Sequence, residues 1–225
     1  MSLTPNFDAV VFDYDDTIAD TIPARIEATR LAFDEAGLVC DAAQFVYATR
    51  GIPLQTALDD ADGGRGRLLG LTAIYRRHYW GKERGLIRLF DGVSDLLDAL
   101  GERAVPLGIL TSKLRDSLVE GRRAGAAVEL EELGVDGRFR CVVGFEDVAN
   151  AKPHPEGLER VISCLGADPA RTLVVGDSWA DVEVARNGGA KSCLATWGLD
   201  DPAEQLARAV PDFTISAPAQ LLDIL

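Results

Sequence analysis

The chain has 225 residues, of which 47% are apolar, and a formal net charge of −13 at pH 7. These values indicate a globular protein that forms one moderate domain or a core with a sizeable insertion. The negative charge argues against nucleic acid and anionic membranes as partners, and no apolar run approaches the 18 residues of a membrane span.

The cysteines and histidines point to an ordinary cytoplasmic protein. The four cysteines are far apart in sequence and form no C-x-x-C pair, so we expect reduced thiols. With only two histidines, a His/Cys zinc site is not expected. No signal peptide is expected before the first strand, which the apolar run predicts at about residues 7–13.

The next ninety residues have helical periodicity. Ile22, Ile26, Thr29 and Phe33 lie on one helical face, and Gly37 ends that helix. Further helices are predicted at residues 42–48, 54–61 and 68–79. The first strand is therefore followed by an all-helical insertion.

After the insertion, helices and strands alternate. Helices are predicted at residues 94–101, 117–133, 156–165 and 180–187, and strands at 105–110, 139–144, 172–175, 191–195 and 213–215. Such alternation is typical of a parallel sheet with right-handed crossovers. We predict an α/β fold with a Rossmann-like parallel sheet core.

Polar residues follow four of the predicted strands. They are Asp13 and Asp15, then Thr111, Ser112 and Lys113, then Lys152, then Asp177 and Asp181. Because ligands of a parallel sheet bind beyond the carboxyl ends of its strands, we expect these side chains to share one crevice. Acids, a hydroxyl and an ammonium together suit a hard cation and a phosphoryl group.

Asp13 and Asp15 are the candidate catalytic pair. If the first strand continues through Asp15, both carboxylates face the same side and repel one another unless a cation such as Mg²⁺ lies between them. Asp13 is then a candidate nucleophile that forms an aspartyl-phosphate, and Asp15 its acid–base partner. The alternative is that residues 15–17 form only a turn and a helix N-cap.

The other three motifs also have a simple structural alternative. Thr111 and Ser112 are predicted to hold a phosphoryl oxygen, or else Thr111 caps a helix. Lys152 is predicted to pair with the phosphoryl group, or else it is a solvated loop lysine. Asp177 is a predicted metal ligand. Asp181 orients the lysine or a metal-bound water, or else it stabilises a helix N-terminus.

Taken in order, these motifs resemble those of the haloacid dehalogenase-like hydrolase superfamily, in its phosphoglycolate phosphatase and β-phosphoglucomutase-like branch. The resemblance implies a core of residues 1–17 and 91–225 and a helical cap of residues 18–90, with hinges near 18–22 and 90–93. It also implies that Asp13 attacks phosphorus, that the backbone carbonyl of Asp15 binds the metal, and that Asp177 is a direct ligand. One departure is Asp16, where the family often has glycine; we expect it to point outward.

Within that family, Asp15 favours phosphoryl transfer over dehalogenation, because an alkoxide leaving group needs a proton and a halide does not. The predicted activity is Mg²⁺-dependent hydrolysis of a small phosphorylated metabolite of the phosphoglycolate or sugar-phosphate type, by a monomer or homodimer. The alternatives are a phosphosugar mutase and a non-catalytic phosphate-binding scaffold. Arg50, in a turn of the cap, is a candidate clamp for a second anionic group, whereas Arg76, Arg77 and His78 are expected to form a solvated helix face.

Overall fold

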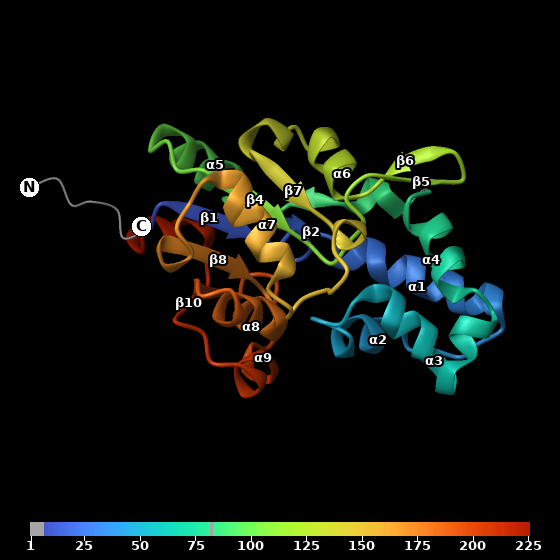
Figure 1. Cartoon of the computed structure of the whole chain (residues 1–225). Helices are drawn as coiled ribbons and strands as arrows, with labels where there is room; N and C mark the ends of the chain where they lie inside the picture. Colours follow the sequence, from blue (N-terminus) through green and yellow to red (C-terminus); the bar gives the residue numbers. More distant parts are fainter. Residues whose placement is uncertain (1–6, 82) are drawn as a thin grey trace, which may run out of the picture.

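A six-stranded parallel sheet forms the centre of the molecule (Figure 1). The computed structural model describes residues 7–81 and 83–225. The strand order is β10 (Phe213–Ile215), β9 (Lys191–Ala195), β8 (Thr172–Gly176), β1 (Ala9–Phe12), β4 (Leu107–Leu110) and β7 (Cys141–Val143). Every neighbouring pair is parallel, which confirms the predicted α/β fold.

Both faces of the sheet are covered by helices, so its central strand is completely buried. On β1, Val10 and Phe12 pack on one face with α5 (Val93–Glu102) and α6 (Ala126–Glu132). Ala9 and Val11 pack on the other face with α7 (Glu156–Leu165) and α8 (Trp179–Asn187). Because both faces are apolar, polar side chains on these strands are accommodated only beyond the strand ends.

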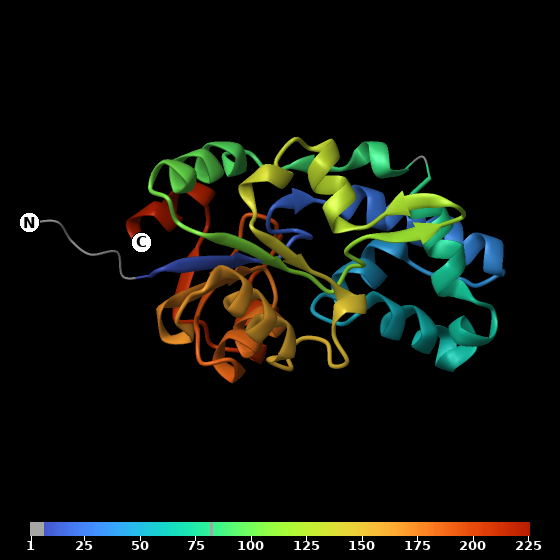
Figure 2. The ribbon, with the colours of Figure 1, turned by 45° about the horizontal axis from the view of Figure 1, so that its top comes forward.

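The inserted helices lie together to one side of the sheet, at its carboxyl edge (Figure 2). They are α1 (Ile22–Ala36), α2 (Ala42–Ala48), α3 (Leu54–Leu68) and α4 (Leu71–Tyr79). The segments that lead into and out of them pair as the short antiparallel strands β2 (Ala19–Asp20) and β3 (Arg88–Leu89). The core and cap boundaries at residues 17/18 and 90/91 stay a prediction.

The predicted long helix at residues 117–133 is wrong. Its first half forms an antiparallel hairpin of β5 (Ser117–Val119) and β6 (Arg122–Ala124). The hairpin turn has Glu120 and Gly121 at φ values of 50° and 78°, and Gly125 follows at 136°. Since backbone at positive φ cannot continue a right-handed helix, α6 begins only at Ala126.

The other elements lie close to their predicted positions. α2, α7, β9 and β10 have the predicted bounds, α3 continues past its predicted end through a kink at residues 61–64, and α9 (Ala203–Arg208) has no predicted counterpart. β1 ends at Phe12, so the strand does not continue through Asp15 as expected. In the described part of the chain, no helix combines the length and apolar character needed to cross a membrane.

Candidate active site

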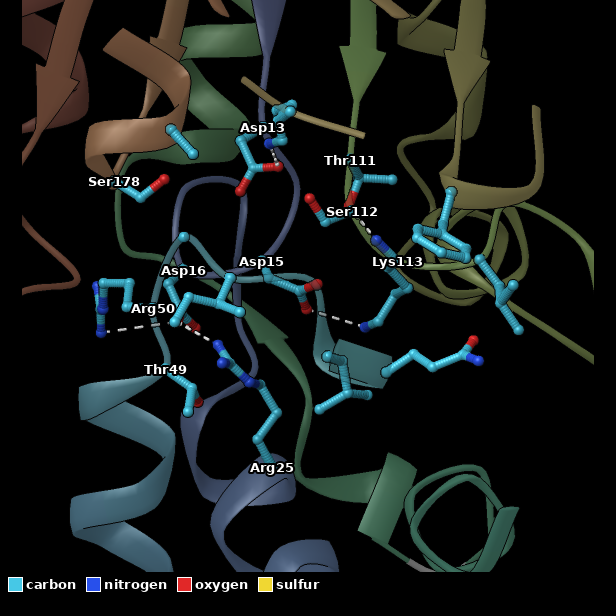
Figure 3. Close-up of a pocket in the computed structure, with 18 of the residues that line it drawn as sticks. Asp13, Asp15, Asp16, Arg25, Thr49, Arg50, Thr111, Ser112, Lys113 and Ser178 are labelled. Atoms are coloured by element: carbon cyan, nitrogen blue, oxygen red, sulfur yellow. Dashed lines mark hydrogen bonds and ion pairs between the residues drawn. The ribbon is translucent and has the colours of Figure 1, made fainter. Parts of the chain in front are cut away.

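The polar residues that follow β1, β4, β7 and β8 line a single pocket at the carboxyl edge of the sheet (Figure 3). They come together with residues from α1, the turn that follows α2, the start of α3, and α4, so the pocket lies between the sheet and the inserted helices. All the residues predicted to act directly on substrate or metal line it, namely Asp13, Asp15, Thr111, Ser112, Lys152 and Asp177, as does Arg50. Its volume is about 100 Å³, which is small beside the roughly 300–1,000 Å³ of pockets for drug-sized ligands.

Lys152 links two buried carboxylates at the centre of the pocket. Its Nζ donates to Asp13 Oδ1 and to Asp181 Oδ1, at 2.7 Å each, and to the carbonyl oxygen of Leu110 at 3.3 Å. The lysine side chain is 7% exposed, so the alternative of a solvated loop lysine is wrong. Asp13 Oδ2 has no hydrogen bond among the described residues and is open to the pocket.

Asp181 is held in place by the start of its own helix. Its Oδ2 accepts from the backbone N–H of Ser178 at 3.1 Å and from the Ser178 hydroxyl at 2.6 Å, while Oδ1 faces Lys152. Asp181 therefore caps the N-terminus of its helix and also pairs with Lys152. The two roles considered for it from the sequence do not exclude one another. Gly176 permits this arrangement, because a Cβ there would overlap the Asp181 carboxylate.

Asp13, Asp177 and Asp181 form a compact cluster of acids. One carboxylate oxygen of each lies within 4.8 Å of the others, and all three residues are buried. Burial raises the pKa of Asp13 well above its ordinary value, and the nearby Asp181 and Asp177 add to the rise against the opposing effect of Lys152. Burial also raises the pKa of Asp177 to about 7, although Arg50 opposes this. Such a set of hard oxygen donors with too little positive charge fits a divalent cation such as Mg²⁺.

Thr111 is buried at the end of β4, facing the pocket. Its hydroxyl oxygen accepts from the backbone N–H of Lys113 at 3.1 Å, in a turn that no helix follows. The alternative that Thr111 caps a helix is therefore wrong. Ser112 also lines the pocket, which leaves both hydroxyls near Asp13 for contact with a ligand (Figure 3).

Asp15 points away from Asp13 toward Lys113, a partner that the sequence analysis does not assign (Figure 3). Lys113 Nζ donates to Asp15 Oδ1 at 2.9 Å, to Glu129 Oε2 at 2.7 Å and to the Tyr79 hydroxyl at 2.6 Å. Burial alone would raise the pKa of Asp15, but Lys113 and Arg25 outweigh it and hold that pKa below its ordinary value. Glu129 is 1% exposed and also accepts from Trp80 Nε1 at 2.9 Å, so this network ties the helical segment to the sheet.

Asp16 does not point outward as expected; it is 1% exposed. Its φ of 60° is the left-handed conformation that glycine adopts readily and aspartate tolerates better than most residues. Its carboxylate accepts from the Thr21 hydroxyl at 3.1 Å and from Arg25 Nη1 at 2.7 Å. Asp16 is thus a buried acid at a left-handed position, and Arg25 of α1 supplies a cation that balances its charge.

Arg50 reaches from the end of α2 to the acids of the sheet. Its Nη1 donates to Asp177 Oδ2 at 2.5 Å, and both terminal nitrogens lie 3.3 Å from the carbonyl oxygen of Gly198. Arg50 is 6% exposed, so the alternative of a solvent-exposed arginine is wrong. In this arrangement its guanidinium pairs with Asp177, one member of the acid cluster.

The fold and this set of acids around one lysine define a hydrolase of the haloacid dehalogenase type. Residues 10–195 match the model of the haloacid dehalogenase-like hydrolase family, and the chain belongs to that family. The predicted family resemblance and the prediction of a hydrolytic enzyme are thereby confirmed.

Relatives and solved structures agree with this assignment. The chain is 30% identical to the pyrophosphatase PpaX of Anoxybacillus flavithermus over 98% of this chain and 97% of the relative. Its structure superimposes on one from Haemophilus somnus described as a predicted phosphoglycolate phosphatase, with a TM-score of 0.82, 22% identity and 99% of each chain covered. A β-phosphoglucomutase from Clostridium difficile gives a TM-score of 0.74 at 19% identity, over 96% of this chain and 93% of that one. Both solved structures share the fold of this chain.

Proposed function

We propose that the chain is a Mg²⁺-dependent phosphatase that hydrolyses a small phosphorylated compound through an aspartyl-phosphate on Asp13. The observation that carries the proposal is the convergence of Asp13, Lys152 and Asp177 on one pocket from three separate strand ends. The full-length similarity to a relative named as a pyrophosphatase supports phosphoryl chemistry and adds pyrophosphate to the phosphoglycolate and sugar phosphates expected from sequence.

The first half of the reaction breaks the phosphate ester or anhydride. Asp13 Oδ2 attacks phosphorus, and the bond from phosphorus to the leaving oxygen breaks as Asp15 gives that oxygen a proton. Lys152 holds Asp13 Oδ1 at 2.7 Å, so the nucleophile is aimed before substrate enters. Thr111 and Ser112 hold equatorial phosphoryl oxygens, and Lys113 orients Asp15.

In the second half, water attacks the phosphorus of the aspartyl-phosphate while Asp15 takes its proton. The bond between phosphorus and Asp13 breaks, which releases phosphate and restores both carboxyl groups. Asp13, Asp177 and the backbone carbonyl of Asp15 would hold Mg²⁺, with Asp181 orienting Lys152 beside it. When bound, the ion supplies positive charge that stabilises the phosphoryl oxygens in the transition state.

Phosphate release from pyrophosphate, phosphoglycolate and p-nitrophenyl phosphate tests the proposal, with and without Mg²⁺. We expect turnover by the wild type with Mg²⁺ and none by Asp13→Asn. Asp8→Asn is the matched control, because Asp8 precedes the same strand at its opposite end, where it pairs with Arg171 on the surface at 2.5 Å. Binding without turnover would indicate a scaffold, and glucose 6-phosphate from β-glucose 1-phosphate would indicate a mutase.

A further inference from the structure

Among the described residues, Arg76 of α4 is the cation of the pocket that has no partner. Among the described residues, the cationic side chains that line it are Arg25, Arg50, Arg76, Lys113 and Lys152. Arg25 pairs with Asp16, Arg50 with Asp177, Lys113 with Glu129 and Lys152 with Asp13. Within the described residues, the guanidinium of Arg76 makes neither an ion pair nor a hydrogen bond.

The environment of Arg76 leaves its charge poorly compensated. The side chain is partly buried, and burial lowers its pKa although the more distant Glu146 and Asp59 oppose this. Arginine stays protonated throughout the physiological range, so the positive charge persists. A half-buried guanidinium with five free donors gains most from an anion that replaces its lost hydration.

The two residues that follow Arg76 behave differently. Arg77 forms an ion pair with Glu35 of α1, and His78 Nε2 lies 3.0 Å from Glu35 Oε2. Arg77 and His78 thus face α1, whereas Arg76 lines the pocket, so the prediction of a solvated helix face is wrong for Arg76. Consecutive helical residues point about 100° apart, so α4 directs two basic residues to its neighbour and one into the pocket.

The helix that carries Arg76 is fixed against the sheet. The rings of Tyr75 and Tyr79 stack with centroids 5.7 Å apart, and the Tyr79 hydroxyl accepts from Lys113. Trp80 Nε1 donates to the buried Glu129. Arg76 is thus held over the pocket with its guanidinium free of ion pairs and hydrogen bonds to the described residues, which is the preorganisation that anion binding needs.

We propose that Arg76 binds a second anionic group on the leaving side of the substrate, so that the enzyme selects small phosphates with two negatively charged ends. Pyrophosphate and phosphoglycolate belong to this class. The inference rests on the proposed phosphatase function, because Asp13 must receive the phosphoryl end. Arg50, the clamp expected from sequence, already contacts Asp177, whereas Arg76 is free to take the other end.

Matched substrates and variants test this proposal. Phosphoglycolate and phosphoethanolamine have similar size, but the end away from the phosphate is anionic in phosphoglycolate and cationic in phosphoethanolamine. In p-nitrophenyl phosphate that end is neutral. The ratio of kcat/KM for phosphoglycolate to that for phosphoethanolamine should fall at least about 10-fold in Arg76→Met, the loss expected for one charge-assisted hydrogen bond. Most of the change should lie in KM, and Arg76→Lys should recover part of it.

Arg77→Met is the control, because it removes the same charge from the neighbouring position on the helix surface. Its substrate ratio should equal that of the wild type. Calorimetry adds a readout without turnover: with Mg²⁺ present, phosphonoacetate should bind the wild type at least about 10-fold more tightly than Arg76→Met, and methylphosphonate should show no such difference.

The outcomes separate the two proposals. Wild-type turnover with the same substrate ratio in wild type and Arg76→Met would overturn the role of Arg76 and leave the phosphatase intact. An equal fall in Arg77→Met would show a general effect of charge and would also overturn it. No phosphate release by the wild type from any substrate would overturn the proposed function and this inference with it.

Discussion

Replacing Lys113 with methionine tests the network that joins the inserted helices to the sheet. The Lys113 side chain is 9% exposed and that of Glu129 1%, and their charged groups lie 2.7 Å apart. Methionine keeps the apolar stem but leaves the carboxylates of Asp15 and Glu129 without this cation. Removing one partner of a buried ion pair costs about 3–5 kcal/mol, so we expect a loss of that size in the free energy of unfolding.

Urea unfolding near pH 7.5, followed by circular dichroism, measures this loss. For a chain of this length, a loss of about 3–5 kcal/mol lowers the melting temperature by roughly 6–20 °C. Lys191→Met is the control, since Lys191 is 54% exposed and its pair with Asp212 is a surface ion pair worth less than about 1 kcal/mol.

A double variant distinguishes charge burial from simple loss of packing. Glu129→Gln keeps an acceptor for Trp80 but removes the buried charge. Lys113→Met with Glu129→Gln should therefore lose less stability than the sum of the two single losses, by about 0.5–3 kcal/mol. If Lys113→Met is no more harmful than Lys191→Met, or if the two single losses simply add, the network does not hold the helices to the sheet.

Three further predictions concern the reaction centre. Asp13→Asn should reduce phosphate release to the level without enzyme while the melting temperature still shows a folded protein; a rate near that of the wild type would remove Asp13 as the nucleophile. Asp15→Asn should slow hydrolysis of phosphoglycolate more than that of pyrophosphate, because an alkoxide needs a proton to leave and phosphate needs it less; equal losses would contradict the acid role. With EDTA present, stability should fall as pH rises from about 4 to 7, because folding raises the pKa of Asp177 from 3.8 to about 7 and the folded state binds a proton that the unfolded state releases. Mg²⁺ at 100 times its Kd should then raise the melting temperature near pH 7.5 by roughly 5–10 °C, and no shift would exclude the metal.

The position of the reaction centre follows from sequence because parallel sheets have a strict geometry. β1 and β8 are short, fully buried strands, and each is followed directly by an aspartate. Once the strands are known to be parallel, Asp13 and Asp177 must lie at the same edge, and register places them together: the Asp13 N–H donates to the carbonyl oxygen of Val175 at 2.8 Å. No information about side-chain packing is needed for that step.

The ion pairs of Asp15 and Asp16 could not be predicted in the same way. Lys113 and Asp15 are 98 residues apart, and the same ammonium also contacts Tyr79 of α4 and Glu129 of α6, so its full set of partners depends on how those helices pack. Arg25 lies only nine residues from Asp16, yet the pair forms because Asp16 adopts a positive φ that no sequence pattern required. The hairpin at residues 117–124 was accessible in principle, since Gly121 and Gly125 both interrupt the apparent helical pattern.

The balance of charge around the pocket links metal and substrate. Six carboxylates and five cationic side chains of the described residues line the pocket or pair with a side chain that does: Asp13, Asp15, Asp16, Glu129, Asp177 and Asp181, with Arg25, Arg50, Arg76, Lys113 and Lys152. With every carboxylate ionised, this set has one excess negative charge, and a phosphoryl dianion entering alone then meets net repulsion in a buried site of low dielectric. A bound divalent cation would make the net charge of this set positive. Binding of Mg²⁺ and of the phosphoryl group should therefore each strengthen the other by the same factor, as thermodynamic linkage requires.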